Sequence, residues 1–223
     1  LEEAELLGEI THTAGAKYVM GVNPISLAIL KTPAECGADV AVGEGQPLGL
    51  DTAFGGPYLG FMTASSAMMR KLPGRIVGPT VDTEGEIGYV LTLSAREQHI
   101  RREKASSNIC SNEQLCAFTA AVYLSAMGEK GLWQAATLCT SKAHYFAQQL
   151  EEKLGWKRVH PGEFFHEFVT ECPDTEKALA ALAKRDILGG LPVEGGILWC
   201  VTEVVTKERL DEAVAILQEV SCG

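Results

Sequence analysis

The stretch from Gly37 to Asn112 constrains the fold most, because short apolar runs alternate there with glycine-rich connections. The runs 39–42, 58–62 and 89–93 have the length and composition of buried β-strands. Glycine allows the backbone to adopt a positive φ or to approach another group closely. Connections of this kind after buried strands are where α/β proteins tend to build their binding sites.

The order of the predicted elements indicates an α/β fold. Apolar residues at helical spacing predict a helix over 1–14, and a strand is expected over 16–23, a short helix over 24–30 and a strand over 38–42. Two strands joined by a short helical connection are typical of a parallel sheet. A strand over 58–64, a short helix over 65–71, an ordered loop or hairpin over 73–88 and a strand over 89–93 complete this part.

The second half of the chain has a different character. A long helix, with its N-cap at Ser111 and Asn112, is predicted to run to Met127 and to stop at Gly128, and a second helix is predicted over 131–154. Strands over 156–159, 164–170 and 195–202 alternate with helices over 175–184 and 207–220, an α+β arrangement. We therefore expect three segments: a large-domain portion over 1–110, linking helices over 111–155 and a small α+β domain over 156–223.

Composition excludes some classes of function. The formal net charge of −10 argues against nucleic-acid binding and against docking on an anionic membrane. No apolar run is long enough for a membrane span. The chain starts inside a helical pattern without an initiator Met, so we expect it to be part of a longer chain.

The seven cysteines form no Cys-x-x-Cys pair and show no zinc-type spacing with histidine. We therefore predict no metal site. An odd number of cysteines in mostly apolar surroundings indicates reduced thiols and a cytoplasmic protein.

A basic segment offers a candidate anion site. Within nine residues it carries Arg96, His99, Arg101, Arg102 and Lys104, and it continues into Ser106, Ser107 and Asn108. Arginine side chains bind phosphate or carboxylate groups in a bidentate manner. The alternative is a solvated or subunit-facing loop whose charges pair with its own glutamates.

Two glycine-rich turns are further candidates. Gly55 and Gly56, followed by Pro57 and Tyr58, could bring backbone amides close to a ligand, or they form a simple tight turn. The loop 43–47 follows a predicted strand end, where α/β proteins place ligand contacts. Neither turn matches a phosphate-binding P-loop or a dinucleotide-binding fingerprint, and no serine or cysteine nucleophile stands out.

Four long motifs resemble one family. They are Gly-Glu-Gly-Gln-Pro-Leu-Gly (43–49), Phe-Gly-Gly-Pro-Tyr-Leu-Gly-Phe (54–61), Pro-Gly-Arg-Ile-Val-Gly (73–78) and Arg-Glu-Gln-His-Ile-Arg-Arg-Glu-Lys-Ala-Ser-Ser-Asn-Ile-Cys (96–110). They are similar to the glycine-cleavage-system P-protein, glycine dehydrogenase (decarboxylating). The resemblance is to subunit 1, the α subunit of the two-subunit bacterial form, and within it to the C-terminal half.

The resemblance implies a pyridoxal-phosphate-dependent transferase of fold type I, with a partial large mixed-sheet domain and a small C-terminal α+β domain. It implies decarboxylation of glycine and transfer of the aminomethyl group to the lipoyl arm of H-protein, with subunit 2 as partner. In such enzymes a lysine holds the cofactor as an imine.

The distribution of lysines bears on the cofactor. No lysine lies between Lys31 and Lys71. In the family, the cofactor lysine belongs to subunit 2 and follows the corresponding strand, where this chain has Gly45 and Gln46. Glutamine cannot form the imine, so no catalytic residue is expected here, and pyridoxal phosphate is expected covalently on the partner subunit.

The resemblance leaves three hypotheses for the role of the chain. It completes the site of subunit 2, it is a purely structural partner, or it is a self-contained enzyme that uses Lys71 or Lys104. Under the first hypothesis, the residues expected to bind the cofactor or to face the partner are Gly55, Gly56, Tyr58, His99, Arg101, Arg102, Ser107 and Asn108. A half-length chain would also expose a sheet edge and an apolar helix face, so self-association is expected.

Overall fold

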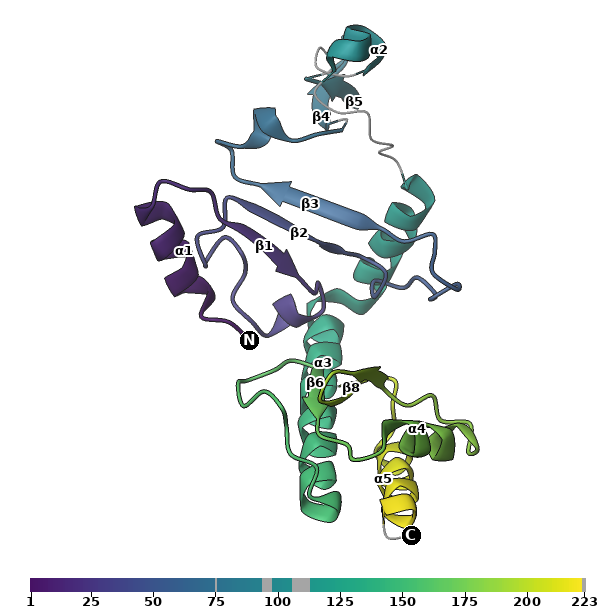
Figure 1. Cartoon of the computed structure of the whole chain (residues 1–223). Coiled ribbons are helices and arrows are strands. Elements are labelled where there is room, and N and C mark those ends of the chain that lie inside the picture. Colours follow the sequence, from purple (N-terminus) through teal and green to yellow (C-terminus); the bar gives the residue numbers. More distant parts are fainter. Residues whose placement is uncertain (75, 94–97, 106–112, 222–223) are drawn as a thin grey trace. The chain divides into compact units, whose positions relative to one another are not determined.

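The computed structural model describes residues 1–74, 76–93, 98–105 and 113–221, which form two compact units (Figure 1). The first, called the N-terminal unit here, comprises Ala4–Pro24 and Lys31–Ser125. The second, the C-terminal unit, comprises Leu1–Glu3, Ile25–Leu30 and Ala126–Gly223. The expected division of the chain at 110 and 155 stays a prediction.

A mixed three-stranded sheet organises the N-terminal unit. Helix α1 (Ala4–Thr13) precedes β1 (Val19–Val22), and β2 (Val40–Glu44) and β3 (Gly60–Ala64) follow. The strand order is β1-β2-β3, with β2 parallel to β1 and antiparallel to β3. The predicted parallel pair is therefore confirmed. The short predicted helix between β1 and β2 is the 3₁₀ turn η1 (Ser26–Ala28), which belongs to the C-terminal unit.

The segment 73–88, predicted as either a loop or a hairpin, is a hairpin. After the 3₁₀ turn η2 (Met69–Lys71), β4 (Ile76–Val81) pairs antiparallel with β5 (Ile87–Thr92). A carboxylate oxygen of Asp82 accepts hydrogen bonds from the backbone N–H groups of Glu84, at 2.8 Å, and of Glu86, at 3.0 Å. This side chain fixes the turn, as aspartate commonly does. Helix α2 (Gln98–Arg101) and the turn η4 (Arg102–Lys104) come next.

Helix α1 packs closely against the rest of its unit at its glycine. Gly8 is the buried residue of the helix, and a Cβ atom there would meet the carbonyl oxygen of Cys36 and the ring of Tyr18. The apolar side chains Leu6, Leu7 and Ile10 are exposed. The helix is thus as predicted, and its apolar face is uncovered in this chain.

Helix α3 (Gln114–Leu154) contains the predicted break. Gly128 has φ 60° and ψ −174°, which is not helical, and separates the helix into two parts. A positive φ costs glycine little, because glycine has no Cβ. The predicted N-cap at Ser111 and Asn112 lies outside the described residues.

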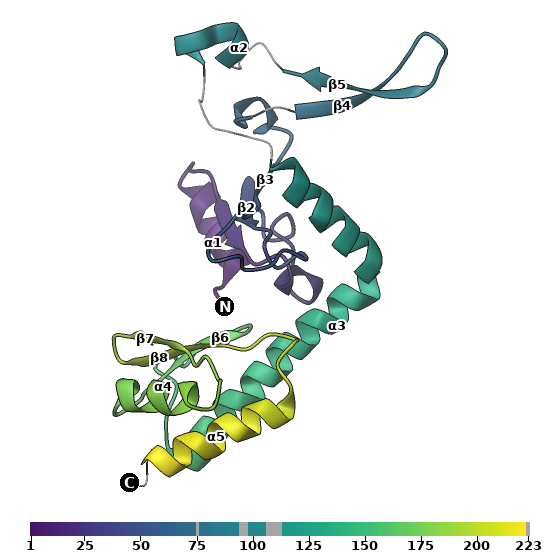
Figure 2. The same ribbon diagram turned by 90° about the vertical axis from the view of Figure 1, so that its right-hand side faces the viewer.

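The C-terminal unit is an antiparallel sheet packed with helices (Figure 2). Its elements are β6 (Glu167–Thr170), α4 (Thr175–Ala183), β7 (Leu191–Val193), β8 (Gly196–Cys200) and α5 (Lys207–Ser221). The strand order is β6-β8-β7. The predicted strand over 156–159 is wrong, since only a bridge between Arg158 and Thr170 forms there. Strand β7 was not predicted.

In the core of this unit, α4, α5 and the sheet pack against the second part of α3. Leu150, Leu182, Ile197 and Leu217 come from four different elements and are completely buried. The ring of Trp199 meets Phe146 edge-on, with ring centroids 5.3 Å apart. Among the described residues, no helix is both long and apolar enough to cross a membrane.

Candidate functional site

The carboxyl end of β2 opens into the glycine-rich loop that the sequence singles out. Glu44, the last residue of β2, accepts backbone hydrogen bonds from Gln46, at 3.0 Å, and from Leu59, at 2.6 Å. The backbone N–H of Gly45 donates to the carbonyl oxygen of Leu59, at 2.7 Å. One carboxylate therefore holds both ends of the loop together.

The family resemblance predicts that Gln46 corresponds to the cofactor lysine of the partner subunit. The side-chain nitrogen of Gln46 donates a hydrogen bond to the carbonyl oxygen of Leu50, at 2.6 Å. The amide group thus stabilises the turn that begins the loop. A glutamine amide has no nucleophilic amine, so this position cannot attach pyridoxal phosphate covalently.

The predicted glycine turn forms the far part of the same loop. Gly55 has φ 103°, and open space surrounds the position where a Cβ would be. Gly56 follows, and the hydroxyl group of Tyr58 donates to the carbonyl oxygen of Thr52, at 3.2 Å. Phe54 is fully exposed beside them. These residues form an open turn at the surface of the described chain.

An ionic cluster fixes the beginning of β2. Asp39, only 9% exposed, accepts hydrogen bonds from the Lys17 ammonium, at 2.9 Å, and from the backbone N–H of Tyr18, at 3.0 Å. A ring nitrogen of His12 lies 2.9 Å from the same carboxylate. The hydrogen bond from Lys17, then that from Tyr18 and then that of His12, holds the pKa of Asp39 well below its usual value.

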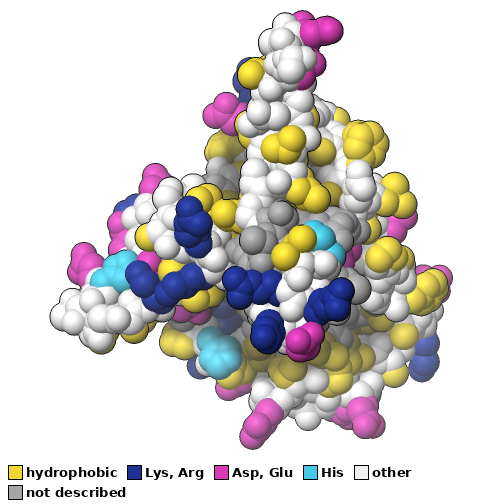
Figure 3. Space-filling model, turned by 90° about the horizontal axis from the view of Figure 1, so that it is seen from above, with side chains coloured by type: hydrophobic (Ala, Val, Ile, Leu, Met, Phe, Trp, Pro, Cys, Tyr) yellow, Lys and Arg dark blue, Asp and Glu magenta, His cyan; other side chains and the backbone are white. Residues whose placement is uncertain are grey.

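The predicted basic segment is only partly described. His99, Arg101 and Arg102 lie on α2 and η4, and all three are exposed. Ser107 and Asn108 lie outside the described residues, as do Arg96 and Ser106. Lys and Arg side chains gather with hydrophobic ones on the face that Figure 3 presents.

The two parts of the predicted site belong to different elements of the N-terminal unit. In both ribbon views α2 lies with the β4–β5 hairpin, whereas the loop that contains Gly55 and Tyr58 lies at one end of β2 and β3 (Figures 1 and 2). The assignment of both parts to a shared interface stays a prediction.

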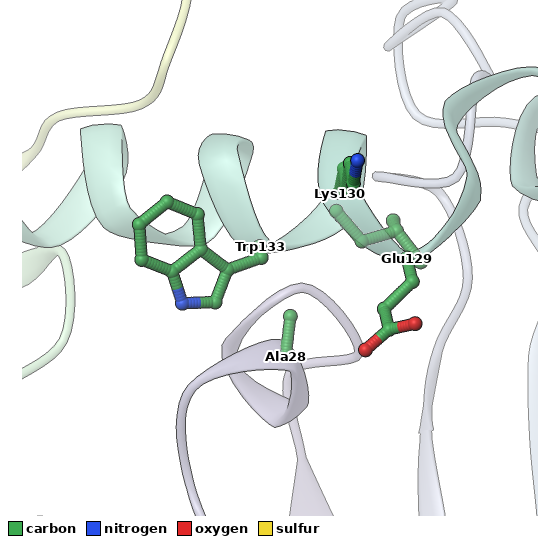
Figure 4. Close-up of a pocket in the computed structure, with 5 residues that line it drawn as sticks. Ala28, Glu129, Lys130 and Trp133 are labelled. Atoms are coloured by element: carbon green, nitrogen blue, oxygen red, sulfur yellow. The ribbon is translucent and has the colours of Figure 1, made fainter.

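A pocket that the sequence analysis did not identify lies in the C-terminal unit (Figure 4). Its volume is about 280 Å³, and it is lined by Ala28, Glu129, Lys130, Leu132 and Trp133. Trp133 is 56% exposed, so the pocket is an open hollow beside α3. Its one acidic and one basic side chain do not form a recognisable catalytic pair.

A cluster of potential metal ligands was also missed. His166, Glu167 and Cys200 each place a ligand atom within 4.8 Å of the other two. Desolvation of the sulfur, followed by the charge of Glu167, raises the pKa of Cys200 to about 11. Burial lowers the pKa of His166. His166 and Glu167 lie far from Cys200 in the sequence, so the three residues show no zinc-type spacing. They meet only because β6 pairs with β8.

Comparison with known proteins identifies the family. The model of the glycine cleavage system P-protein family matches residues 1–217. The chain belongs to this P-protein family. It is 48% identical to the probable glycine dehydrogenase (decarboxylating) subunit 1 of Desulfitobacterium hafniense, over 99% of the chain and 51% of the relative. The corresponding protein of Chlorobium chlorochromatii is 49% identical, over 97% of the chain and 50% of the relative.

The chain thus spans about half the length of the P-protein relatives that it matches. A solved glycine decarboxylase (P-protein) structure, in inhibitor-bound form, superimposes with a TM-score of 0.93 at 44% identity and covers 99% of this chain and 52% of its own.

More distant structures agree on the fold. The cysteine desulfurase of Thermococcus onnurineus gives a TM-score of 0.67 at 16% identity, over 99% of this chain and 56% of the other. The predicted fold type I of pyridoxal-phosphate-dependent enzymes is confirmed.

Proposed function

We propose that this chain is part of subunit 1 of a two-subunit glycine decarboxylase and corresponds to the C-terminal half of that subunit. The complete enzyme would decarboxylate glycine with pyridoxal phosphate and pass the aminomethyl group to the lipoyl arm of H-protein. This chain would hold no catalytic residue. Its role would be to complete the active site of subunit 2, which would carry the cofactor lysine.

One observation carries the proposal: the loop after β2, where the family resemblance predicts the cofactor lysine of the partner subunit, has Gln46 and no lysine in this chain. The family match extends over residues 1–217, so the difference is not a sign of an unrelated fold. The Gln46 amide is bonded to Leu50, and the loop closes on Glu44. The residues at the end of β2 therefore form a self-contained turn and do not fit a covalently attached cofactor.

Lys71 and Lys104, the two lysines considered for a self-contained enzyme, are poor replacements for the cofactor lysine. Lys71 ends η2 and Lys104 ends η4, and both are exposed. Both lysines lie outside the β2 loop, which argues against a self-contained enzyme.

The surfaces assigned to the partner are the open glycine turn and the basic segment. Gly55, Gly56 and Tyr58 would approach subunit 2 with little side-chain bulk. His99, Arg101 and Arg102, with Ser107 and Asn108, would supply positive charge and hydrogen bonds for an anion at the shared site. The exposure of the three described basic residues supports this assignment.

The test uses the complete subunit 1, reconstituted with subunit 2 and lipoylated H-protein. Arg101→Ala and Arg102→Ala, introduced together, should abolish most of the glycine-dependent turnover and leave assembly unchanged in analytical ultracentrifugation. Lys184→Ala, at an exposed position after α4, is the control that should change neither quantity.

The second candidate function is that of a purely structural partner, which the exposed apolar side chains on the first part of α3 favour. Under that alternative, the double substitution leaves turnover unchanged or lowers it only in proportion to lost assembly. Unchanged turnover in a fully assembled complex would overturn the assignment of this segment to the shared site.

A further inference from the structure

The C-terminal unit contains three different metal-binding side chains at one place on its sheet. The imidazole of His166, the carboxylate of Glu167 and the thiol of Cys200 place their ligand atoms within 4.8 Å of one another. They belong to the strands β6 and β8 and to the residue before β6 (Figure 1). This place lies in a different unit from the β2 loop.

The sheet register explains why the three groups meet. Glu167 is directly opposite Cys200 in the antiparallel pair β6–β8, and directly opposite residues project to the same face. The carbonyl oxygen of His166 accepts a hydrogen bond from the backbone N–H of Val201, at 3.0 Å, so the ladder continues beyond Glu167. His166 is thereby held next to the pair.

The neighbouring residues make this framework rigid. Phe168 and Trp199, which form the next pair in the register, are 5% and 4% exposed. They point into the core of the unit, where Trp199 also bonds to Thr170. The strands that carry the three ligands are therefore fixed by the core, whereas His166 is half-buried and Glu167 and Cys200 are exposed.

We propose that His166, Glu167 and Cys200 bind one zinc-type divalent metal ion, with a water molecule in the fourth coordination position. Zinc accepts nitrogen, sulfur and carboxylate ligands at about 2.0–2.3 Å in a tetrahedron, so neighbouring ligand atoms lie about 3.3–3.8 Å apart. The ligand atoms, which lie within 4.8 Å of one another, would have to approach by about 1 Å to reach that geometry. This proposal does not depend on the proposed function.

The mixed donor set distinguishes the site from a simple acidic surface patch. Imidazole and thiolate favour zinc over magnesium and calcium, which prefer oxygen ligands. On binding, Cys200 loses its thiol proton to solvent, because the thiolate is the form that coordinates metal. The bound metal would then clamp β6 to β8 through their side chains.

The experiment is titration of the intact 223-residue chain, under reducing conditions, with Zn²⁺ by calorimetry and with Co²⁺ by absorption spectroscopy. We expect one site per chain and a thiolate-to-cobalt charge-transfer band. Cys200→Ala should remove the band and weaken Zn²⁺ binding at least tenfold, and His166→Ala should weaken binding similarly. Glu167→Gln, which keeps the size of the side chain, tests the carboxylate separately.

Cys172→Ala and His160→Ala are the matched controls, since they remove the same ligand types elsewhere in this unit and should leave the affinity unchanged. The proposal is overturned if the chain binds no Zn²⁺ stoichiometrically. It is equally overturned if the Cys200→Ala protein keeps both the affinity and the absorption band, which would place the metal at another cysteine.

Discussion

Gln46 and Leu50 are joined by a hydrogen bond in which the side-chain amide nitrogen donates to the carbonyl oxygen over 2.6 Å. This bond forms the first turn after β2, where the proposed partner subunit would carry its cofactor lysine. The chain therefore uses the residue at this position for loop structure. The proposed division of labour between the subunits rests on this difference.

Removing this hydrogen bond should weaken the loop measurably. Gln46→Ala is expected to lower the free energy of unfolding by about 1 kcal/mol, which is typical for one neutral hydrogen bond in a partly buried place. Urea unfolding measures the change. Gln148→Ala is the control, because its bond to Glu152 is an exposed contact within one helix and should contribute only a few tenths of a kcal/mol. Equal effects in both variants would contradict the structural role of Gln46.

The buried hydrogen bond between Trp199 and Thr170 makes a second prediction. The indole nitrogen of Trp199 donates to the Thr170 hydroxyl over 2.8 Å, and Thr170 is completely buried. Thr170→Val keeps the shape but leaves the indole N–H without this acceptor, so it should cost about 1–3 kcal/mol. Thr119→Val, whose hydroxyl bonds within an exposed helical turn, should change the stability by less than about 0.5 kcal/mol. Similar unfolding midpoints for the two variants would argue against the bond.

Asp39 should make the stability of the N-terminal unit depend on pH. Its pKa is depressed in the folded state by Lys17, Tyr18 and His12, so its contribution is complete above the ordinary aspartate pKa of about 4. The contribution is lost as the pH falls below that value. We expect Asp39→Asn to be less stable than the unchanged chain at pH 7, with the difference narrowing towards pH 3.

Chemical unfolding at both pH values measures this narrowing. Asp51→Asn, in the exposed part of the β2–β3 loop, should show no comparable change with pH. A stability difference for Asp39→Asn that stays constant from pH 7 to pH 3 would show that the Asp39 charge is not responsible.

The uncovered apolar faces should make the isolated chain self-associate. On the first part of α3, Leu115, Phe118 and Val122 follow helical spacing and are 79%, 67% and 53% exposed. A contiguous exposed apolar face commonly marks an interaction surface.

Light scattering should give a mass above the 23.9 kDa of one chain. Phe118→Asp should shift the mass towards the monomer, whereas Leu188→Asp, at a fully exposed position in the C-terminal unit, should not. A monodisperse monomer would disprove the prediction.

The sequence predicted most of the fold because its signals are local. The helical spacing before Gly15 and the glycine at 128 correctly predicted α1 and the break in α3. Strand β7 was missed because its three residues include Pro192 and are too short for a recognisable alternation. The predicted strand over 156–159 failed because that segment contributes only one bridge to β6, and a bridge to a distant partner leaves no local pattern.

The candidate site was less predictable, since it depends on long-range pairing. The sequence identified the glycine turn around Gly55, but it gave no information on the distance between that turn and Arg101. His166 and Cys200 become neighbours only through the pairing of β6 with β8, so a search for close sequence spacing could not find them.

The most direct test of the account is to incubate the chain with pyridoxal phosphate, reduce it with borohydride, and determine the intact mass and the modified peptide. Borohydride converts an imine between lysine and the cofactor into a stable adduct. If the chain lacks the cofactor lysine, no saturable single-site adduct forms. One saturable adduct, at Lys71, Lys104 or any other lysine, would contradict the account and make the chain an enzyme in its own right.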